Sequence, residues 1–180
     1  MGCKLVKFEV INFSGARIIG KSTVVKTDIE IDDPVIETLW KNMRQNNDLD
    51  YLLKLSNKIT EEHDFVGWSG DFNPGDNQYT YLAGVLFNPN TEVPDGYEYR
   101  DITSCEMAVG WLLRTTDGEG DIHVNASEYI SKAEKENGYE YDGKNGFFEM
   151  EYYSNERFYI PERNGENVTL DFYSPCKKIE

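Results

Sequence analysis

Two glutamates and a tyrosine alternate along the segment 148–153, which reads Phe-Glu-Met-Glu-Tyr-Tyr. Alternation of this kind places Glu149, Glu151 and Tyr153 on one face of a strand. A carboxylate beside aromatic rings attracts a flat, lipophilic cation, because charge pairing and cation–π attraction act together away from water. The alternative is that this face meets water, where glutamates need no special explanation. The segment is therefore a candidate ligand site.

Aromatic residues are abundant: the chain has 12 Tyr, 9 Phe and 3 Trp. A surplus of rings favours strands, and it also suits a ring-lined pocket. Our candidate pocket walls are Trp40, Tyr81, Trp111 and Trp68, in that order. Each of these side chains could instead be an ordinary core residue, and for Trp111 the core is the favoured interpretation.

Other reactive constellations are missing from the sequence. The chain has three widely spaced cysteines and two histidines that lie 60 positions apart, an arrangement that matches neither a zinc site nor a disulfide framework. We therefore expect no metal and no cofactor, and sparse free cysteine favours a cytoplasmic protein. Cys105 has no activating neighbour in sequence and is interpreted as a buried small residue.

The charge balance limits the partners. With 18 basic and 33 acidic residues, the chain has a formal net charge of −15. Such a chain repels phosphate backbones, so we expect no direct nucleic-acid binding. No apolar run approaches the ~20 residues needed to cross a bilayer, and no apolar leader precedes the first predicted strand. The expected partner is a small hydrophobic or cationic aromatic ligand, with any protein partner unknown.

The first half of the chain shows strand and helix periods in a simple order. Strands are predicted over 4–13 and 16–26, and Gly20 is expected to mark a bulge or a close approach. Asp32-Asp33-Pro34 predicts a helix that begins at Pro34 and carries a stripe from Val35 to Met43. A second short helix is predicted over 49–55, followed by strands over 65–68 and 79–87 around a turn at 73–76.

The same order recurs in the second half. Strands are predicted over 97–102, 106–115, 147–153 and 168–173, with one helix that begins near Ala126 behind a capping box at Asn125 and ends at Gly138. The chain therefore predicts a single α+β domain, 1–180, with antiparallel strands and two halves, 1–88 and 95–180, joined by the connector 89–94.

Four blocks, in the right order over nearly the whole chain, resemble the GyrI-like small-molecule-binding family, whose fold is shared by effector-binding domains of AraC- and MerR-type regulators. The blocks are Glu-Tyr-Tyr-Ser-Asn-Glu-Arg-Phe at 151–158, Ile-Glu-Thr-Leu-Trp at 36–40, Tyr-Thr-Tyr-Leu-Ala-Gly-Val at 79–85 and Val-Pro-Asp-Gly-Tyr-Glu-Tyr at 93–99. Departures are the additional acid Glu149 and a less apolar final segment at 171–175.

The resemblance implies a tandem, pseudo-symmetric repeat of strand-helix-strand-strand units with a pocket at the seam. It places Glu151 at the floor of that pocket, and strand parity adds Glu149 and Tyr153. The first function implied is a stand-alone module that binds hydrophobic, often cationic, aromatic compounds for sequestration or sensing. The alternatives are a hydrolase of cyclopropane-bearing genotoxic compounds, with Glu151 as general base, and an acidic protein that inhibits a DNA-acting enzyme such as gyrase.

Overall fold

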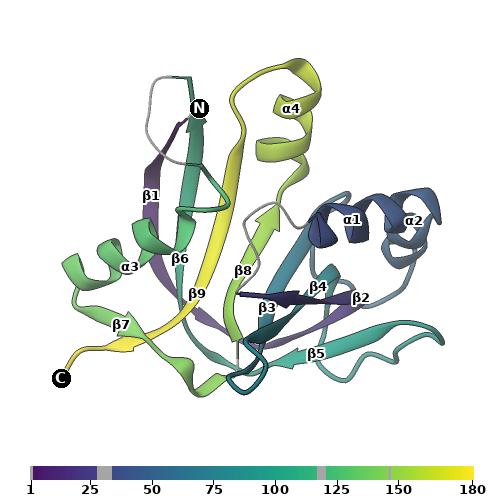
Figure 1. The fold of residues 1–180 in the computed structure, drawn as a ribbon, viewed down its shortest axis with the longest axis horizontal. Coiled ribbons are helices and arrows are strands. Elements are labelled where there is room, and N and C mark those ends of the chain that lie inside the picture. Colours follow the sequence, from purple (N-terminus) through teal and green to yellow (C-terminus); the bar gives the residue numbers. More distant parts are fainter. Residues whose placement is uncertain (1, 28–33, 117–120, 146) are drawn as a thin grey trace.

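A computed structural model describes residues 2–27, 34–116, 121–145 and 147–180 (Figure 1). Within these residues the chain forms one large sheet, three helices of six residues or more and several shorter helical turns. The first half contains β1 (Gly2–Phe13), β2 (Ala16–Lys26), α1 (Val35–Gln45), α2 (Asp48–Leu53), β3 (Phe65–Asn73) and β4 (Gln78–Phe87). The second half contains β5 (Glu98–Ile102), β6 (Cys105–Thr115), α3 (Ala126–Glu136), β7 (Tyr139–Tyr141), η1 (Gly143–Asn145), β8 (Phe147–Tyr153), η2 (Asn155–Tyr159), α4 (Ile160–Asn164) and β9 (Thr169–Lys178). Of the described helices, none is long and apolar enough to cross a membrane.

The sheet places the two halves side by side in mirrored order. Its strands run β1-β6-β9-β8-β3-β4-β2-β5, with β7 paired to β9, and every pair in the described residues is antiparallel. This confirms the predicted α+β class and its antiparallel pairing. The halves meet where β3 pairs with β8, a pairing that we call the seam. Each half also lends its first strand to the other, because β1 pairs with β6 and β5 pairs with β2.

Two apolar clusters lie on opposite faces of the sheet. The first contains helix residues such as Trp40, Met43 and Ile130 together with inward-facing strand residues such as Phe172. Helices α1 and α2 pack on β2 and β4, and α3 packs on β1, β6 and β9, so the helices cover this face (Figure 1). The second cluster is built from strand residues, including Trp68 and Met150. Alternate residues of one strand therefore serve two different cores.

Gly20 makes a close backbone approach, as the sequence predicted. It lies opposite Gly84 where β2 pairs with β4, and a Cβ on Gly20 would collide with the Ala83 carbonyl oxygen. The pairing between these strands is regular, so of the two expectations for Gly20 the structure shows the close approach.

The helices α1 and α3 start where the sequence predicts, but the capping interaction predicted for α3 is not the one observed. The first helical hydrogen bond of α1 runs from the Thr38 N–H to the Pro34 carbonyl, whereas Asp32 and Asp33 lie outside the described residues. The capping box predicted at Asn125 is wrong: its side chain makes no cap to α3 and instead accepts a hydrogen bond from the Asp121 N–H at 2.8 Å. The preceding loop, not the helix, therefore uses Asn125.

The C-terminal region differs most from the sequence prediction. The last strand extends to Lys178, and residues 155–164 form a π-helical turn and a short helix that the periodicity did not indicate. This helical segment follows β8 directly, so it carries its aromatic residues onto the end of the seam.

Candidate functional site

Glu151 lies on β8 at the seam, directly opposite Gly67 of β3. Its side chain is only 12% exposed. The Tyr153 hydroxyl donates a hydrogen bond to Oε2 at 2.7 Å, and the Tyr81 hydroxyl donates to the same oxygen at 3.1 Å. Tyr81 in turn accepts a hydrogen bond from the Trp40 indole N–H at 3.1 Å. A chain of donors from α1 and β4 thus reaches the carboxylate from the first half of the molecule.

The other carboxylate oxygen faces a histidine. His123 Nδ1 lies 2.9 Å from Oε1, and its ring stacks on Tyr153 with centroids 6.2 Å apart. Burial alone would lower the pKa of His123, and Arg114 acts in the same direction. The Glu151 hydrogen bond and the charges of Glu151 and Asp121 outweigh this, so the pKa is raised above its ordinary value. The imidazolium form is therefore favoured beside Glu151.

Aromatic rings surround this carboxylate. The Tyr153 ring meets Phe158 and Trp40 edge-on, with ring centroids 5.0 and 5.5 Å apart. Trp40 meets Phe65 in the same way, with centroids 6.5 Å apart. We call this group the Glu151 cluster: Trp40, Phe65, Tyr81, His123, Glu151, Tyr153 and Phe158. It combines one buried carboxylate with ring faces and edges, which is the surrounding that a flat organic cation needs.

The sequence candidates divide between the two faces of the sheet. Glu151, Tyr153, Trp40 and Tyr81 come together. Glu149 has the same strand parity, and its pKa is raised to about 7 by burial first and by the charge of Glu151 second. The Glu149 carboxyl group is therefore partly protonated near neutral pH.

Trp68 and Trp111 do not join the Glu151 cluster, which corrects their selection as pocket walls. Trp68 pairs with Met150, so it points to the other face and packs against Phe147. Trp111 lies on the same far face, where Lys7 and Arg157 stack over its ring at 4.4 and 4.6 Å. Both assignments failed because they rested on residue type, whereas facing is set by strand register.

His123, Phe65 and Phe158 are members of the site that sequence reasoning missed. Phe158 belonged to the quoted C-terminal motif, and Phe65 shares the parity of Gly67, so both carried a weak signal. His123 lies in the loop before α3, where no periodicity applies. No pattern in the sequence could have placed its ring beside Glu151.

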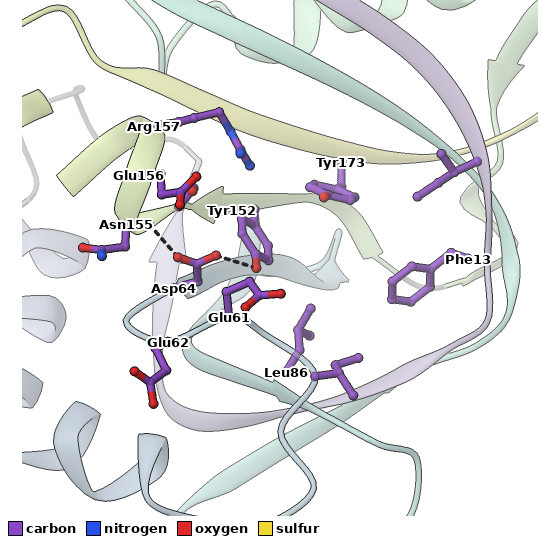
Figure 2. A pocket seen from close by; sticks show the side chains of 13 residues that line it. Phe13, Glu61, Glu62, Asp64, Leu86, Tyr152, Asn155, Glu156, Arg157 and Tyr173 are labelled. Atoms are coloured by element: carbon purple, nitrogen blue, oxygen red, sulfur yellow. Dashed lines mark hydrogen bonds between the residues drawn. The ribbon is translucent and has the colours of Figure 1, made fainter. Parts of the chain in front are cut away.

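Two cavities in the described part of the chain have linings that do not include Glu151. The larger, of about 690 Å³, opens on the opposite face of the sheet, and we call it the Tyr152 cavity (Figure 2). It is lined by Ile11, Phe13, Ile59, Glu61, Glu62, Asp64, Leu86, Tyr152, Ser154, Asn155, Glu156, Arg157 and Tyr173. Figure 2 shows its buried Asp64, which accepts hydrogen bonds from the Tyr152 hydroxyl at 2.8 Å and the Asn155 N–H at 2.6 Å. That carboxylate is already engaged by the protein itself.

The smaller cavity, of about 510 Å³, has Phe65 and Tyr159 among its lining residues. Phe65 is itself a member of the Glu151 cluster, and the Tyr159 ring stacks on Tyr153 with centroids 6.2 Å apart. Arg44 and Arg163 line this cavity together with Asp50, so the balance of fixed charge in the lining is basic and disfavours cations. The family resemblance implies a pocket with Glu151 at its floor; the structure places the His123 ring next to the carboxylate.

Comparison with known proteins identifies the fold. No family model matches the sequence, and no curated protein matches it. Among solved structures, SAV2435 bound to tetraphenylphosphonium has a TM-score of 0.61 at 11% identity, covering 96% of this chain and 94% of that chain. A putative bacterial transcription regulation protein from Staphylococcus aureus MU50 has a TM-score of 0.59 at 11% identity, covering 95% of this chain and 98% of that chain. The C-terminal domain of EcmrR has a TM-score of 0.53 at 12% identity, covering 96% of this chain and 98% of that chain.

These likenesses extend over nearly the whole length of the chain. The protein therefore has the α+β fold of these structures, in agreement with the GyrI-like fold expected from its sequence. At this identity the likeness concerns the fold, and the chemistry of the site must be argued from its own residues.

Proposed function

We propose that this protein is a small-molecule-binding module whose ligand is a hydrophobic, cationic aromatic compound held at Glu151. One observation carries the proposal: a nearly buried carboxylate is fixed by the Tyr81 and Tyr153 hydroxyl groups and surrounded by rings. Among the residues that the structure describes, no lysine or arginine lies within ion-pair distance of Glu151. A buried carboxylate without a permanent cation favours a ligand that brings one.

A structural role for Glu151 would need a fixed basic partner, such as the nearby Arg157. Arg157 pairs instead with Asp171 on the far face of the sheet, with Nε 3.0 Å from Oδ1. Arg157 therefore does not neutralise Glu151, whose ionisable partner among the described residues is His123. SAV2435, whose structure holds tetraphenylphosphonium, supports the proposal in that a protein of this fold accommodates a lipophilic aromatic cation.

The test compares a planar aromatic cation with a neutral aromatic of equal size by titration calorimetry. Glu151→Gln keeps the shape and removes the charge. We expect the cation to lose about 1.5–3 kcal/mol of binding free energy, the range for a hydrogen bond to a charged group, and the neutral compound to lose little. Glu156→Gln, on the Tyr152 cavity, is the matched control. Cation binding that survives Glu151→Gln but fails in Glu156→Gln would move the site to that cavity.

Hydrolysis is the second candidate, and the His123–Glu151 pair favours it. The carboxylate holds Nδ1, so the imidazole is oriented to exchange a proton through Nε2 with water or substrate. Turnover of a cyclopropane-bearing electrophile that disappears in Glu151→Gln while binding persists would establish this function. Binding without product, measured by chromatography over the same period, would leave the protein a binding module.

A further inference from the structure

The His123 ring already makes the contacts that a cationic ligand of this site would make. Its Nδ1 is 2.9 Å from Glu151 Oε1, its face stacks on Tyr153, and its plane meets Phe158 edge-on at 6.4 Å. The ring reaches this position from a loop, and its side chain is still 39% exposed. An aromatic, ionisable ring is thus laid into the site by the chain itself.

The loop that carries His123 is held by short-range contacts rather than by core packing of the ring. Asp121 Oδ1 accepts hydrogen bonds from the His123 N–H at 2.8 Å and from the Val124 N–H at 3.4 Å. The neighbouring Ile122 is fully buried and anchors the segment. A rotation of the His123 side chain alone would therefore vacate the site without unfolding the loop.

We propose that His123 is the built-in occupant of the Glu151 site, and that the site selects planar aromatic cations which carry an N–H and bind by displacing the imidazole. The proposal rests on the proposed function and defines its ligand class more narrowly. A ligand of this class replaces each interaction of the displaced ring: the hydrogen bond to Oε1, the stacking on Tyr153 and the positive charge.

The two oxygens of the Glu151 carboxylate have different partners, which explains why a ligand needs an N–H group. Oε2 accepts both tyrosine hydroxyls, whereas Oε1 faces the imidazole nitrogen. A cation without an N–H would leave Oε1 desolvated and without a donor, which costs more than the lost bond alone. A peralkylated ring of equal charge should consequently bind more weakly than its N–H counterpart.

Displacement should also depend on pH, because the groups that face His123 bias its charge. Glu151 and Asp121 favour the imidazolium and Arg114 opposes it, while Tyr81 and Tyr153 remain neutral. A protonated His123 is the stronger competitor, so a permanently charged ligand should bind better as pH rises. Ionisation of Glu149, on the same face, changes affinity in the same direction and must be separated by a variant.

The experiment uses 4-aminoquinolinium and its 1-methyl-4-(dimethylamino) analogue, which share the ring and the charge but differ in N–H groups. Both are titrated calorimetrically into the full chain, into His123→Ala and into the control His63→Asn, at about pH 6 and about pH 8. We expect 4-aminoquinolinium to bind about tenfold or more tightly than the alkylated probe in the full chain. His123→Ala should increase the affinity for both probes about threefold or more. In a Glu149→Gln background, which removes the contribution of Glu149, adding His123→Ala should also flatten the pH dependence of binding that remains.

Equal affinities of the two probes, or an affinity in His123→Ala that is unchanged or weaker, would overturn the proposal while leaving cation binding intact. Absence of binding in all variants would instead overturn the proposed function, and this inference with it. Imidazole resonances followed by NMR provide the second readout. The His123 signal should shift toward that of a solvated ring on addition of 4-aminoquinolinium, and a signal that does not move would contradict displacement.

Discussion

Gly67 and Glu151 lie opposite each other across the seam, and the position that a Gly67 side chain would fill holds the Tyr81 hydroxyl group. A Cβ at residue 67 would also come within 3.2 Å of Glu151 Oε2. The site thus depends on a residue without a side chain as much as on its carboxylate. This strand position needs glycine for space, not for an unusual backbone angle.

Gly67→Ala should therefore damage both the fold and the site. The added methyl group must push the buried Tyr81 ring away from Glu151, and overpacking of this kind costs about 1–3 kcal/mol of unfolding free energy. Cation affinity should fall in the same variant, because Tyr81 can no longer fix the carboxylate. Gly75→Ala, in the exposed β3–β4 turn, is the control for urea unfolding and calorimetry, and equal stability of the two variants would contradict the crowding at Gly67.

The two tyrosines of the site should differ in their contributions to stability. Tyr153→Phe removes one hydrogen bond to Glu151, whereas Tyr81→Phe also leaves the buried Trp40 indole N–H without its acceptor. We expect a loss of about 1 kcal/mol for Tyr153→Phe and about 2–3 kcal/mol for Tyr81→Phe. Adding Trp40→Phe to Tyr81→Phe should cost less than the sum of the single changes. Strict additivity in this urea-unfolding cycle would argue against the Trp40–Tyr81–Glu151 chain.

Glu149 should make stability depend on pH. Its pKa is raised to about 7 in the folded protein, so folding favours its protonated form. That contribution is fully present below the pKa of an unfolded glutamate and is lost as pH rises through about 7. Glu149→Gln should match the parent near pH 5 and exceed its unfolding free energy by about 2 kcal/mol near pH 8. The exposed Glu166→Gln should show no such divergence in thermal melts, and parallel curves for Glu149→Gln would contradict the raised pKa.

The Arg157–Asp171 pair should respond asymmetrically to removal of either partner. The Asp171 side chain is 2% exposed and that of Arg157 is 33% exposed. Arg157→Met strands a buried carboxylate and should cost about 3 kcal/mol, whereas Asp171→Asn leaves a guanidinium that water can reach and should cost about 1 kcal/mol. Burial already raises the pKa of Asp171, and Arg157 holds it down. The deficit of Arg157→Met should therefore shrink as pH falls, and a constant deficit between about pH 4 and about pH 8 would contradict this account.

Element order was within reach of the sequence, because it follows from local signals. Alternation defined β8 with the bounds the structure shows, and Pro34 marked the start of α1. The same alternation placed Glu151 and Tyr153 on one face. Local periodicity is preserved in the fold, so conclusions that depend only on it are confirmed.

The composition of the site required information that periodicity does not contain. Trp68 and Trp111 have the right chemistry and the wrong face, because facing depends on which residues of neighbouring strands pair. The pairing of Gly67 with Glu151 joins positions that are 84 residues apart in sequence. His123 comes from a loop whose conformation is set by Asp121 and Asn125 rather than by any repeating pattern. The sequence patterns would be the same whether the His123 ring lay beside Glu151 or left that place open.

The exchange of first strands between the halves has a consequence for synthesis of the chain. Phe13 pairs with Cys105 and Gly2 with Thr115, so β1 waits for a partner translated roughly 90 to 110 residues later. At about 5–20 residues per second this interval lasts on the order of 5–20 seconds, during which β1 is an unsatisfied edge. Its exposed Lys4 supplies a charge that discourages pairing with a neighbouring nascent chain. Strand exchange thus makes the order of translation, and not only the final contacts, part of how this protein reaches its native state.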